Sequence, residues 1–386
     1  MEIYLDNAAT TQMDHTVFEK MIPYLKDNYG NPSSAYKIGR DNKEIIENAR
    51  KEVAEILNAN PSEIYFTSGG SEADNMALKG IVLGNADKGK HIITSTIEHP
   101  AILDTCKELE REGFEISYIG VNENGIVDLQ ELENKIRKDT VLISIMFANN
   151  EIGTIQPIKK ISEIAKKNNI LFHTDSVQAV GNIRIDVKEM NIDSLSLSAH
   201  KFYGPKGIGV LYLREGIKFR KYLNGGHQEK NRRAGTENVA GIVGLAKAMS
   251  LAYDNLQENN KRTIELRDYF INEIIHNIQR VKINGNLENR LPGNISVSFE
   301  FVEADNILHE LDKRGIYIST GSACTTGSIE SSHVLKALGL SDSMAHSTIR
   351  ISIGKYNTKE DIDYTIKCLI DIVNNLRRLS PLYIGN

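Results

Sequence analysis

Short apolar runs that alternate with amphipathic helical patterns constrain the fold of this chain most strongly. The candidate strands are rich in β-branched and apolar residues and lie at 63–67, 91–96, 115–120, 140–147, 170–175, 194–199 and 207–213. Helical patterns lie between them, for example at 72–84, 99–112, 128–137 and 157–168. This alternation predicts an α/β fold, a mainly parallel sheet with helices on both faces. Ligands of such sheets bind at the carboxyl ends of strands, so the residues just after each strand are candidate site residues.

The pattern changes from about residue 236 onwards. A long helical region (236–277) is followed by the strand NISVSFEF, a helix at 303–314, the strand IYIST, a helix at 331–338, the strand TIRISIG and a last helix at 358–378. This order predicts a smaller α+β domain joined to the first by the long helix. We expect a large domain at 15–255 and a small domain formed by 1–14 and 256–386.

Composition narrows the classes of function. The 386 residues carry a net charge of −5 without a basic block, which disfavours a nucleic-acid partner. Neither a secretory signal nor an apolar run of membrane-spanning length is present, so we expect no membrane partner. Three cysteines, an odd number, favour the reducing cytoplasm. The absence of CxxC and HExxH gives no support for a metal site.

A lysine follows the strand at 194–199. Lys201 stands beside Ser198 and His200 in SLSLSAHKFYGPKG. A lysine among hydroxyl and imidazole groups suits a Schiff-base role, if its pKa is lowered by desolvation or positive charge. The alternative is a solvated lysine at the start of a loop.

An acid follows the strand at 170–175. Asp175 ends the apolar run ILFHTD, with Gln178 three residues later. A carboxylate there suits the protonated pyridine nitrogen of pyridoxal phosphate, because that pairing lets the ring accept electrons. The alternative is an aspartate that caps the next helix.

Three further strand ends carry polar groups. Gly70 and Ser71 begin a helix after a glycine turn, which suits phosphate binding, although a plain tight turn is the alternative. His99 begins the next helix and suits stacking on a flat ring and proton transfer, although it also suits a capping or core role. Asn150 suits hydrogen bonding to a cofactor or substrate, or a simple turn. Cradle, histidine, asparagine, acid and lysine occur in this order, each after a strand.

Cys324 lies among small residues in GSACTTGS (321–328), without the apolar neighbours of a structural cysteine. Small residues and glycines predict a segment with considerable conformational freedom. Cys106 and Cys368 differ, because each lies at helical spacing from apolar residues and is expected in the core. Replacing either by alanine is expected to leave activity intact.

Taken together, these motifs resemble those of the cysteine desulfurases of the NifS/IscS type, which have the class V aminotransferase fold. The resemblance runs nearly end to end and is carried by YLDNAATT (4–11), YGNPSS (29–34), TSGGSEADN (67–75), IEHPAIL (97–103), NNEIGTIQP (149–157), HTDSVQA (173–179), SAHKFYGPKG (198–207), RRAGTEN (232–238), STGSACTTGS (319–328) and IRISIG (349–354). It implies a pyridoxal 5'-phosphate-dependent transferase fold of type I, like that of aspartate aminotransferase.

The resemblance also implies roles for individual residues. Lys201 would carry the cofactor, Asp175 would pair with the pyridine nitrogen, Gln178 would contact the ring hydroxyl and His99 would stack on the ring. Asn150 and Arg350 would bind the substrate, with Arg350 on its carboxylate. Cys324 would be the nucleophile that accepts sulfur. The phosphate would be held by Gly70, Ser71, Ser198 and His200, joined by Thr236 from the second subunit of a homodimer.

The activity implied is conversion of L-cysteine to L-alanine, with sulfur passing to Cys324 as a persulfide and then to an acceptor protein. The acceptor would serve iron–sulfur cluster assembly or thiolation. A selenocysteine lyase and another class V aminotransferase are the alternatives. This chain has Gly70-Ser71 where relatives commonly have Ala-Thr, and Ser176 where alanine is common. The hydroxyl at 71 is retained, so we expect phosphate binding to be retained.

Overall fold

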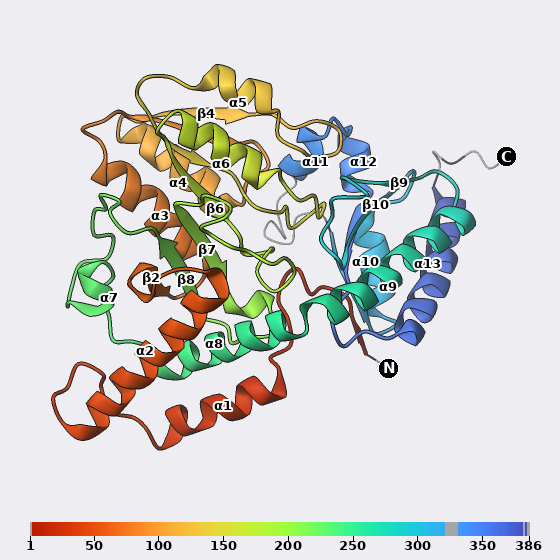
Figure 1. Cartoon of the computed structure of the whole chain (residues 1–386). Helices are drawn as coiled ribbons and strands as arrows, with labels where there is room; N and C mark the ends of the chain where they lie inside the picture. Colours follow the sequence, from red (N-terminus) through yellow and green to blue (C-terminus); the bar gives the residue numbers. More distant parts are fainter. Residues whose placement is uncertain (1, 321–330, 381–382, 384–386) are drawn as a thin grey trace.

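A central seven-stranded sheet organises the first two thirds of the molecule (Figure 1). The computed structural model describes residues 2–320, 331–380 and 383. The strand order is β2-β8-β7-β6-β5-β3-β4. The bounds are β2 Ile64–Thr67, β3 His91–Ser95, β4 Glu115–Ile119, β5 Thr140–Ser144, β6 Leu171–Asp175, β7 Ser194–Ser198 and β8 Gly209–Leu213.

The sheet is mainly parallel, as predicted. β4, β3, β5, β6 and β7 run parallel to one another, whereas β8 is antiparallel to both of its neighbours, β7 and β2. The short β7–β8 connection explains the reversal, because a parallel crossover needs a dozen or more residues. The carboxyl ends of β2 and of the five parallel strands therefore lie at one edge.

Side-chain alternation along the strands builds two cores, one on each face. On β3 and β5, Ile92 and Leu142 join one buried cluster, and the next residues, Ile93 and Ile143, join the other. Helices α3 (Gly70–Gly84) and α4 (Pro100–Arg111) pack on the first face. The opposite face is covered by α1 (His15–Lys26), α2 (Lys37–Leu57), α5 (Leu129–Lys135), α6 (Ile158–Lys167) and α8 (Val239–Asp254).

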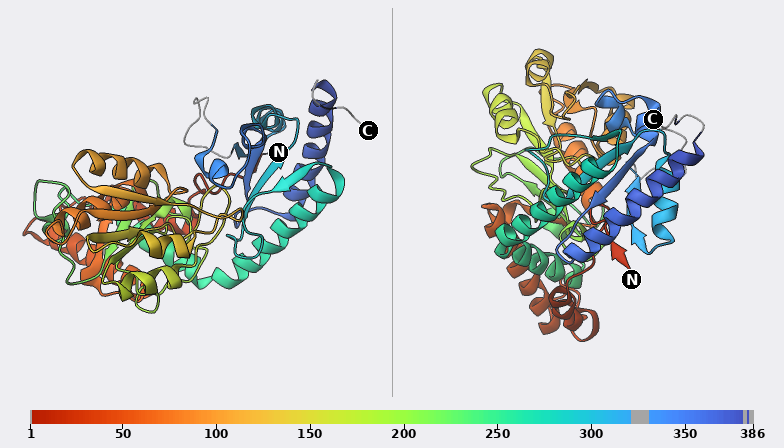
Figure 2. Two further views of the ribbon diagram at one scale, coloured as in Figure 1. Left: turned by 90° about the horizontal axis from the view of Figure 1, so that it is seen from above. Right: turned by 90° about the vertical axis from the view of Figure 1, so that its right-hand side faces the viewer.

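A second, smaller body is built around an antiparallel sheet with the order β12-β13-β10-β9 (Figure 2). Its strands are β9 Val281–Ile283, β10 Asn294–Phe299, β12 Ser319–Thr320 and β13 Thr348–Ser352. Helices α9 (Leu256–Asn277), α10 (Ala304–Asp312) and α13 (Lys359–Leu379) cover it, and α11 (His333–Ala337) and α12 (Asp342–His346) follow the gap in the described chain. This body has a separate apolar core. The predicted α+β part is therefore present, and the domain boundaries at 14/15 and 255/256 remain a prediction.

The first residues of the chain belong to the core of the smaller body. β1 (Ile3–Tyr4) pairs in parallel with β11 (Ile316–Tyr317), and Ile3 and Leu5 are buried in that core. The chain then crosses to the large sheet, where Thr11 N–H donates to the carbonyl of His200 over 2.9 Å. The segment between these contacts, residues 5–11, runs past the carboxyl edge of the sheet.

The expectation of one helix over 236–277 is wrong. The structure has two helices, α8 and α9, which meet at Asn255. Asn255 has φ −106° and ψ 13°, and its side-chain amide donates to the carbonyl of Leu251 over 3.0 Å. Asparagine competes in this way with the regular backbone bonds of a helix, which explains the break.

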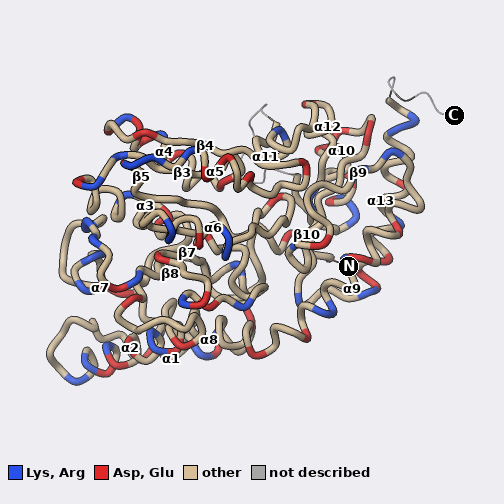
Figure 3. The backbone as a smooth tube through the Cα atoms, turned by 45° about the horizontal axis from the view of Figure 1, so that its top comes forward, with Lys and Arg blue, Asp and Glu red and all other residues tan. Residues whose placement is uncertain are grey.

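Charges of both signs are interspersed over the whole molecule (Figure 3). None of the helices in the described ranges combines the length and apolar character that a membrane crossing requires. Within the same ranges, His, Cys, Asp and Glu side chains form no group of three or more with the arrangement of a metal site.

Candidate active site

The carboxyl edge of the large sheet forms a phosphate-sized cavity at the start of α3. The cavity has a volume of about 340 Å³ and is lined by Gly70, Ser71, Ser198 and His200, together with Lys206. A β-carbon at position 70 would lie 2.7 Å from Cγ2 of Val177. Glycine at 70 therefore lets the start of α3 approach the loop after β6 closely. The structure thus brings together four of the predicted phosphate ligands.

The start of α3 provides backbone N–H groups to this cavity. The first helical hydrogen bond joins the N–H of Ala73 to the carbonyl of Gly69 over 3.1 Å. The N–H groups of the first turn have no intrahelical acceptor and carry the positive end of the helix dipole. Burial lowers the pKa of His200 to about 4, so its imidazole is neutral and can donate one hydrogen bond. These donors, with the ammonium of Lys206, fit a phosphate group.

Lys201 and Gln178 are held by the same backbone carbonyl. Lys201 lies in the short 3-10 turn after β7, and its Nζ donates to the carbonyls of Ala8 and Ala9 over 2.5 and 2.7 Å. Nε2 of Gln178 donates to the carbonyl of Ala8 over 3.0 Å. The N-terminal segment 5–11 therefore connects two predicted cofactor ligands.

Asp175 ends β6 and is buried at the same edge. Its Oδ1 accepts a hydrogen bond from the N–H of Val177 over 2.9 Å. Burial raises the pKa of Asp175, and the nearby His99 and Lys201 oppose that rise. Three of the predicted residues therefore lie within electrostatic reach of one another. A protonated ring nitrogen beside Asp175 would stabilise its carboxylate, so this position also fits the cofactor.

His99 is the N-cap of α4, the alternative that the sequence left open. Its Nδ1 accepts a hydrogen bond from the N–H of Ala101 over 3.1 Å. Burial lowers the pKa of His99, and Lys201 contributes in the same direction. Capping fixes the orientation of the imidazole, and stacking on a cofactor ring remains a prediction.

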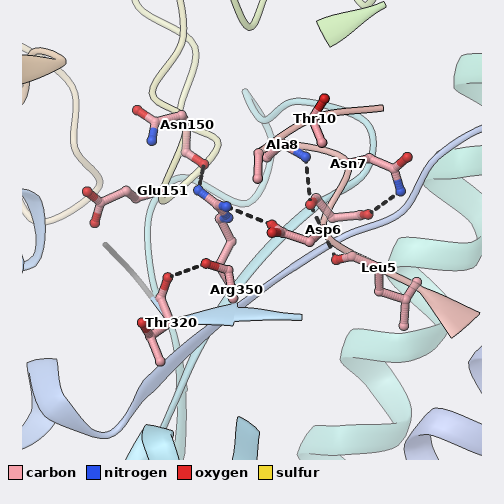
Figure 4. Close-up of polar contacts among 12 residues, drawn as sticks. Leu5, Asp6, Asn7, Ala8, Thr10, Asn150, Glu151, Thr320 and Arg350 are labelled. Carbon is pink, nitrogen blue, oxygen red and sulfur yellow. Dashed lines mark hydrogen bonds and ion pairs between the residues drawn. The ribbon is translucent and has the colours of Figure 1, made fainter. Parts of the chain in front are cut away.

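Arg350 lies on β13 and reaches the large body from the small one (Figure 4). Its Nη2 donates to Oδ1 of Asp6 over 2.7 Å, and its Nη1 donates to the carbonyl of Asn150 over 3.3 Å. Arg350 is only 1% exposed, and its Nε has no hydrogen-bond partner among the described residues. Asn150 thus meets Arg350 through its main chain, whereas the predicted role of its side-chain amide is not tested.

One predicted site residue, Thr236, lies apart from this arrangement. Thr236 lines a neighbouring cavity of about 140 Å³, which shares Ser68 and Gly207 with the phosphate-sized cavity but does not contain Ser71. Cys324 lies outside the described residues. Cys106 and Cys368 are buried in separate apolar clusters, which confirms their predicted core positions.

Buried acids close to the site were not predicted. Glu98 precedes His99, and its Oε1 accepts hydrogen bonds from Ser95 Oγ over 2.6 Å and from the N–H of Met146 over 2.9 Å. Asp74 on α3 is fully buried, and burial together with the charge of Asp175 raises its pKa. Asp6 and Asp74 occur in the motifs YLDNAATT and TSGGSEADN, and Glu98 in IEHPAIL. In the sequence, the position of these acids inside the motifs is the feature that could have pointed to them.

Comparison with known proteins gives consistent matches over the whole chain. The family model "Aminotransferase class-V" matches residues 3–365. A cysteine desulfurase IscS of Methanosarcina thermophila is 54% identical over 98% of this chain and 94% of its own. A second protein of that name, from Dictyoglomus turgidum, is 52% identical over 98% of this chain and 96% of its own.

Solved structures agree. A structure titled as a NifS-like protein has a TM-score of 0.92 at 41% identity and covers 97% of this chain and 100% of that chain. A structure titled SspA in complex with cysteine has a TM-score of 0.82 at 38% identity, over 92% of this chain and 100% of that chain. The predicted fold, that of the type I pyridoxal-phosphate transferases, is confirmed by these matches.

Proposed function

Because the chain belongs to the class-V aminotransferase family, we propose that it is a pyridoxal-phosphate-dependent cysteine desulfurase. It converts L-cysteine to L-alanine and passes the sulfur to Cys324, and then to an acceptor protein. The observation that supports this most directly is the grouping of Lys201, Asp175 and His99 within electrostatic reach at one sheet edge, next to the cavity at the start of α3.

Pyridoxal phosphate, when bound, supplies an electron sink that stabilises negative charge at the substrate Cα. We assign Lys201 as the residue that would hold the cofactor through Nζ and would take the Cα proton of the substrate. Asp175 keeps the ring nitrogen protonated, and Gln178 contacts the ring hydroxyl. The phosphate is held by Gly70, Ser71, Ser198 and His200.

Arg350 binds the substrate carboxylate, together with Asn150. One Nη of Arg350 already donates to Asp6, and its Nε, which has no partner among the described residues, can donate to a second acceptor. The family's substrate fits this charge, because L-cysteine carries one carboxylate.

In the sulfur transfer, the thiolate of Cys324 attacks the substrate sulfur. The new bond joins the two sulfur atoms, and the bond between Cβ and sulfur breaks. Its electron pair stays on the carbon, which is then protonated to give L-alanine. The net reaction is L-cysteine plus the Cys324 thiol to L-alanine plus a Cys324 persulfide. Thr320, the last described residue before the gap, pairs in register with Ile349, next to Arg350.

We further propose a homodimer in which Thr236 of one chain completes the phosphate site of the other. An unusually apolar surface supports association: Phe18 and Leu25 on α1 are 48% and 63% exposed, and Tyr29 is 80% exposed.

We propose the reducing cytoplasm as the location, in keeping with the buried unpaired thiols of Cys106 and Cys368. The acceptor is proposed to be an iron–sulfur scaffold or another sulfur-accepting protein.

The decisive experiment compares the wild type with Cys324→Ala in the presence of L-cysteine and a reductant. We expect the wild type to release equal amounts of alanine and sulfide, and Cys324→Ala to release little of either. Equal output from both proteins would overturn the assignment of Cys324. Turnover of selenocysteine alone would indicate a lyase, and a keto-acid product would indicate an aminotransferase.

A further inference from the structure

Helix α11 begins at the point where the two bodies of the molecule meet (Figure 1). Its N-cap, Ser332, comes from the small body, and its Oγ donates to Oε2 of Glu151 over 2.5 Å. Both residues of this pair are buried. The same Oγ accepts the N–H of Leu335 over 3.3 Å, so one hydroxyl caps the helix and docks it.

The next residue of α11 makes a second contact with the large body. Nε2 of His333 lies 3.0 Å from the carbonyl oxygen of Glu98. Residues 332 and 333 therefore contact the loops after β3 and β5. Glu98 immediately precedes His99, and Glu151 immediately follows Asn150. Each loop is thus held at a residue that is adjacent in sequence to an assigned site residue.

Apolar packing reinforces these polar contacts. Val334 and Leu335 of α11 are buried against Ile97, Met146 and Ile152 of the large body. Burying such side chains stabilises the contact, and the hydrogen bond between Ser332 and Glu151 is itself buried. The start of α11 is therefore a fixed point on the large body, although it belongs in sequence to the small one.

This fixed point follows Cys324 by eight positions in the sequence. We propose that Ser332 and Glu151 are positioning residues: they anchor the chain that carries Cys324 to the loops that carry His99 and Asn150. This inference rests on the proposed function, because it takes Cys324 as the acceptor of sulfur. It assigns to Glu151 and Ser332 a role in sulfur transfer but not in binding of cofactor or cysteine.

The test separates the two stages of the reaction in the holoenzyme. The change in the cofactor absorbance on adding L-cysteine reports substrate binding. Single-turnover alkylation with mass spectrometry reports persulfide on Cys324. The variants are Ser332→Ala and Glu151→Leu, which remove the donor and the acceptor of the Ser332–Glu151 hydrogen bond. The matched control is Ser331→Ala, because the Oγ of the adjacent Ser331 donates to Asp342 of the small body over 2.7 Å instead.

We expect Ser332→Ala and Glu151→Leu each to slow persulfide formation about tenfold, the effect of losing one buried hydrogen bond. The L-cysteine concentration that gives the half-maximal absorbance change is expected to stay within about twofold of wild type. Ser332→Thr, which keeps the hydroxyl, is expected to restore the rate. The double variant is expected to be no slower than either single variant, because both remove the same bond.

Two results would overturn the proposal. One is a persulfide rate in Ser332→Ala equal to that in Ser331→Ala. The other is an equal loss of cysteine binding and persulfide formation, which indicates a general structural role. Failure of the proposed function is distinguishable, because the wild type itself would then form no persulfide on Cys324.

Discussion

At the scale of single residues, a few buried charges hold the site together. The ion pair of Arg350 and Asp6 joins β13 to the N-terminal segment, and Arg350 also holds the main chain at Asn150. A guanidinium with so little exposure must be compensated by acceptors of the protein or of a ligand. Asp6 compensates it before the substrate arrives, and a substrate carboxylate would add a second anion.

Asp6→Asn removes that compensation. We expect the variant to be less stable than the wild type by about 1–3 kcal/mol, because a buried charge loses its charged partner. L-Alanine, the product, should then raise the melting temperature more in the variant than in the wild type, because its carboxylate replaces Asp6. Differential scanning fluorimetry of both holoenzymes, with and without alanine, measures this. Asp87→Asn, which breaks an exposed pair with Lys218, is the control.

Glu98 predicts a specific dependence of stability on pH. Burial raises its pKa to about 8 from an ordinary value of 4.5. Because the folded state binds this proton more tightly, the stabilisation is complete below about pH 4.5 and is lost as the pH rises to about 8. Glu98→Gln keeps the neutral shape and cannot ionise. Between about pH 5 and 8, the difference in unfolding free energy should shift by about 3–4 kcal/mol in favour of the variant. Urea unfolding at three pH values tests this, and a constant difference would refute it.

At the scale of elements, the loop that carries Thr236 is held in a strained form. Glu229, Lys230 and Asn231 have φ of 44°, 54° and 62°, the left-handed region that residues with a β-carbon avoid. Glu229 accepts two hydrogen bonds from Arg50 of α2, over 2.7 and 2.9 Å, and one from the N–H of Phe66 over 2.9 Å. These buried contacts stabilise the loop against its own strain.

Arg50→Ala should therefore be costly. We expect a loss of about 3–5 kcal/mol, because Glu229 is left buried and unpaired. Lys37→Ala, which removes the exposed pair with Asp41 on the same helix, should change stability little. Chemical unfolding of the two variants measures the contrast. Similar effects of both substitutions would contradict the account.

Sequence reasoning placed the strands and the residues after them, because alternation and strand-end motifs are local. It missed the contact of Lys201 and Gln178 with Ala8, because a main-chain carbonyl has no signature in the sequence. It also missed the break at Asn255, since a single asparagine does not show whether its side chain points to solvent or to the backbone. The ion pair of Arg350 with Asp6 could not be predicted from the sequence either, because the two residues lie 344 positions apart.

At the scale of the whole molecule, the proposed dimer predicts complementation between damaged chains. Thr236→Val and Ser71→Ala homodimers should each bind pyridoxal phosphate weakly, because each lacks one phosphate ligand in both sites. In a mixed dimer, one site would carry both defects and the other neither. We expect a purified mixed dimer to recover about half of the wild-type cofactor content and activity, and an equal mixture that pairs at random to recover about a quarter. Absorbance titration and turnover measure this, and a mixture no better than its parents would refute an exchanged Thr236.

The parallel pairing of β1 with β11 has a consequence for folding during synthesis of the chain. The first residues leave the ribosome long before their partners at 316–317 and 352 have been translated. β1 therefore stays without its partner strand until more than four fifths of the chain has been synthesised. A translation product that ends before residue 316 lacks the contacts that fix Asp6 and the segment beside Lys201. Prematurely terminated chains should consequently be inactive in sulfur transfer.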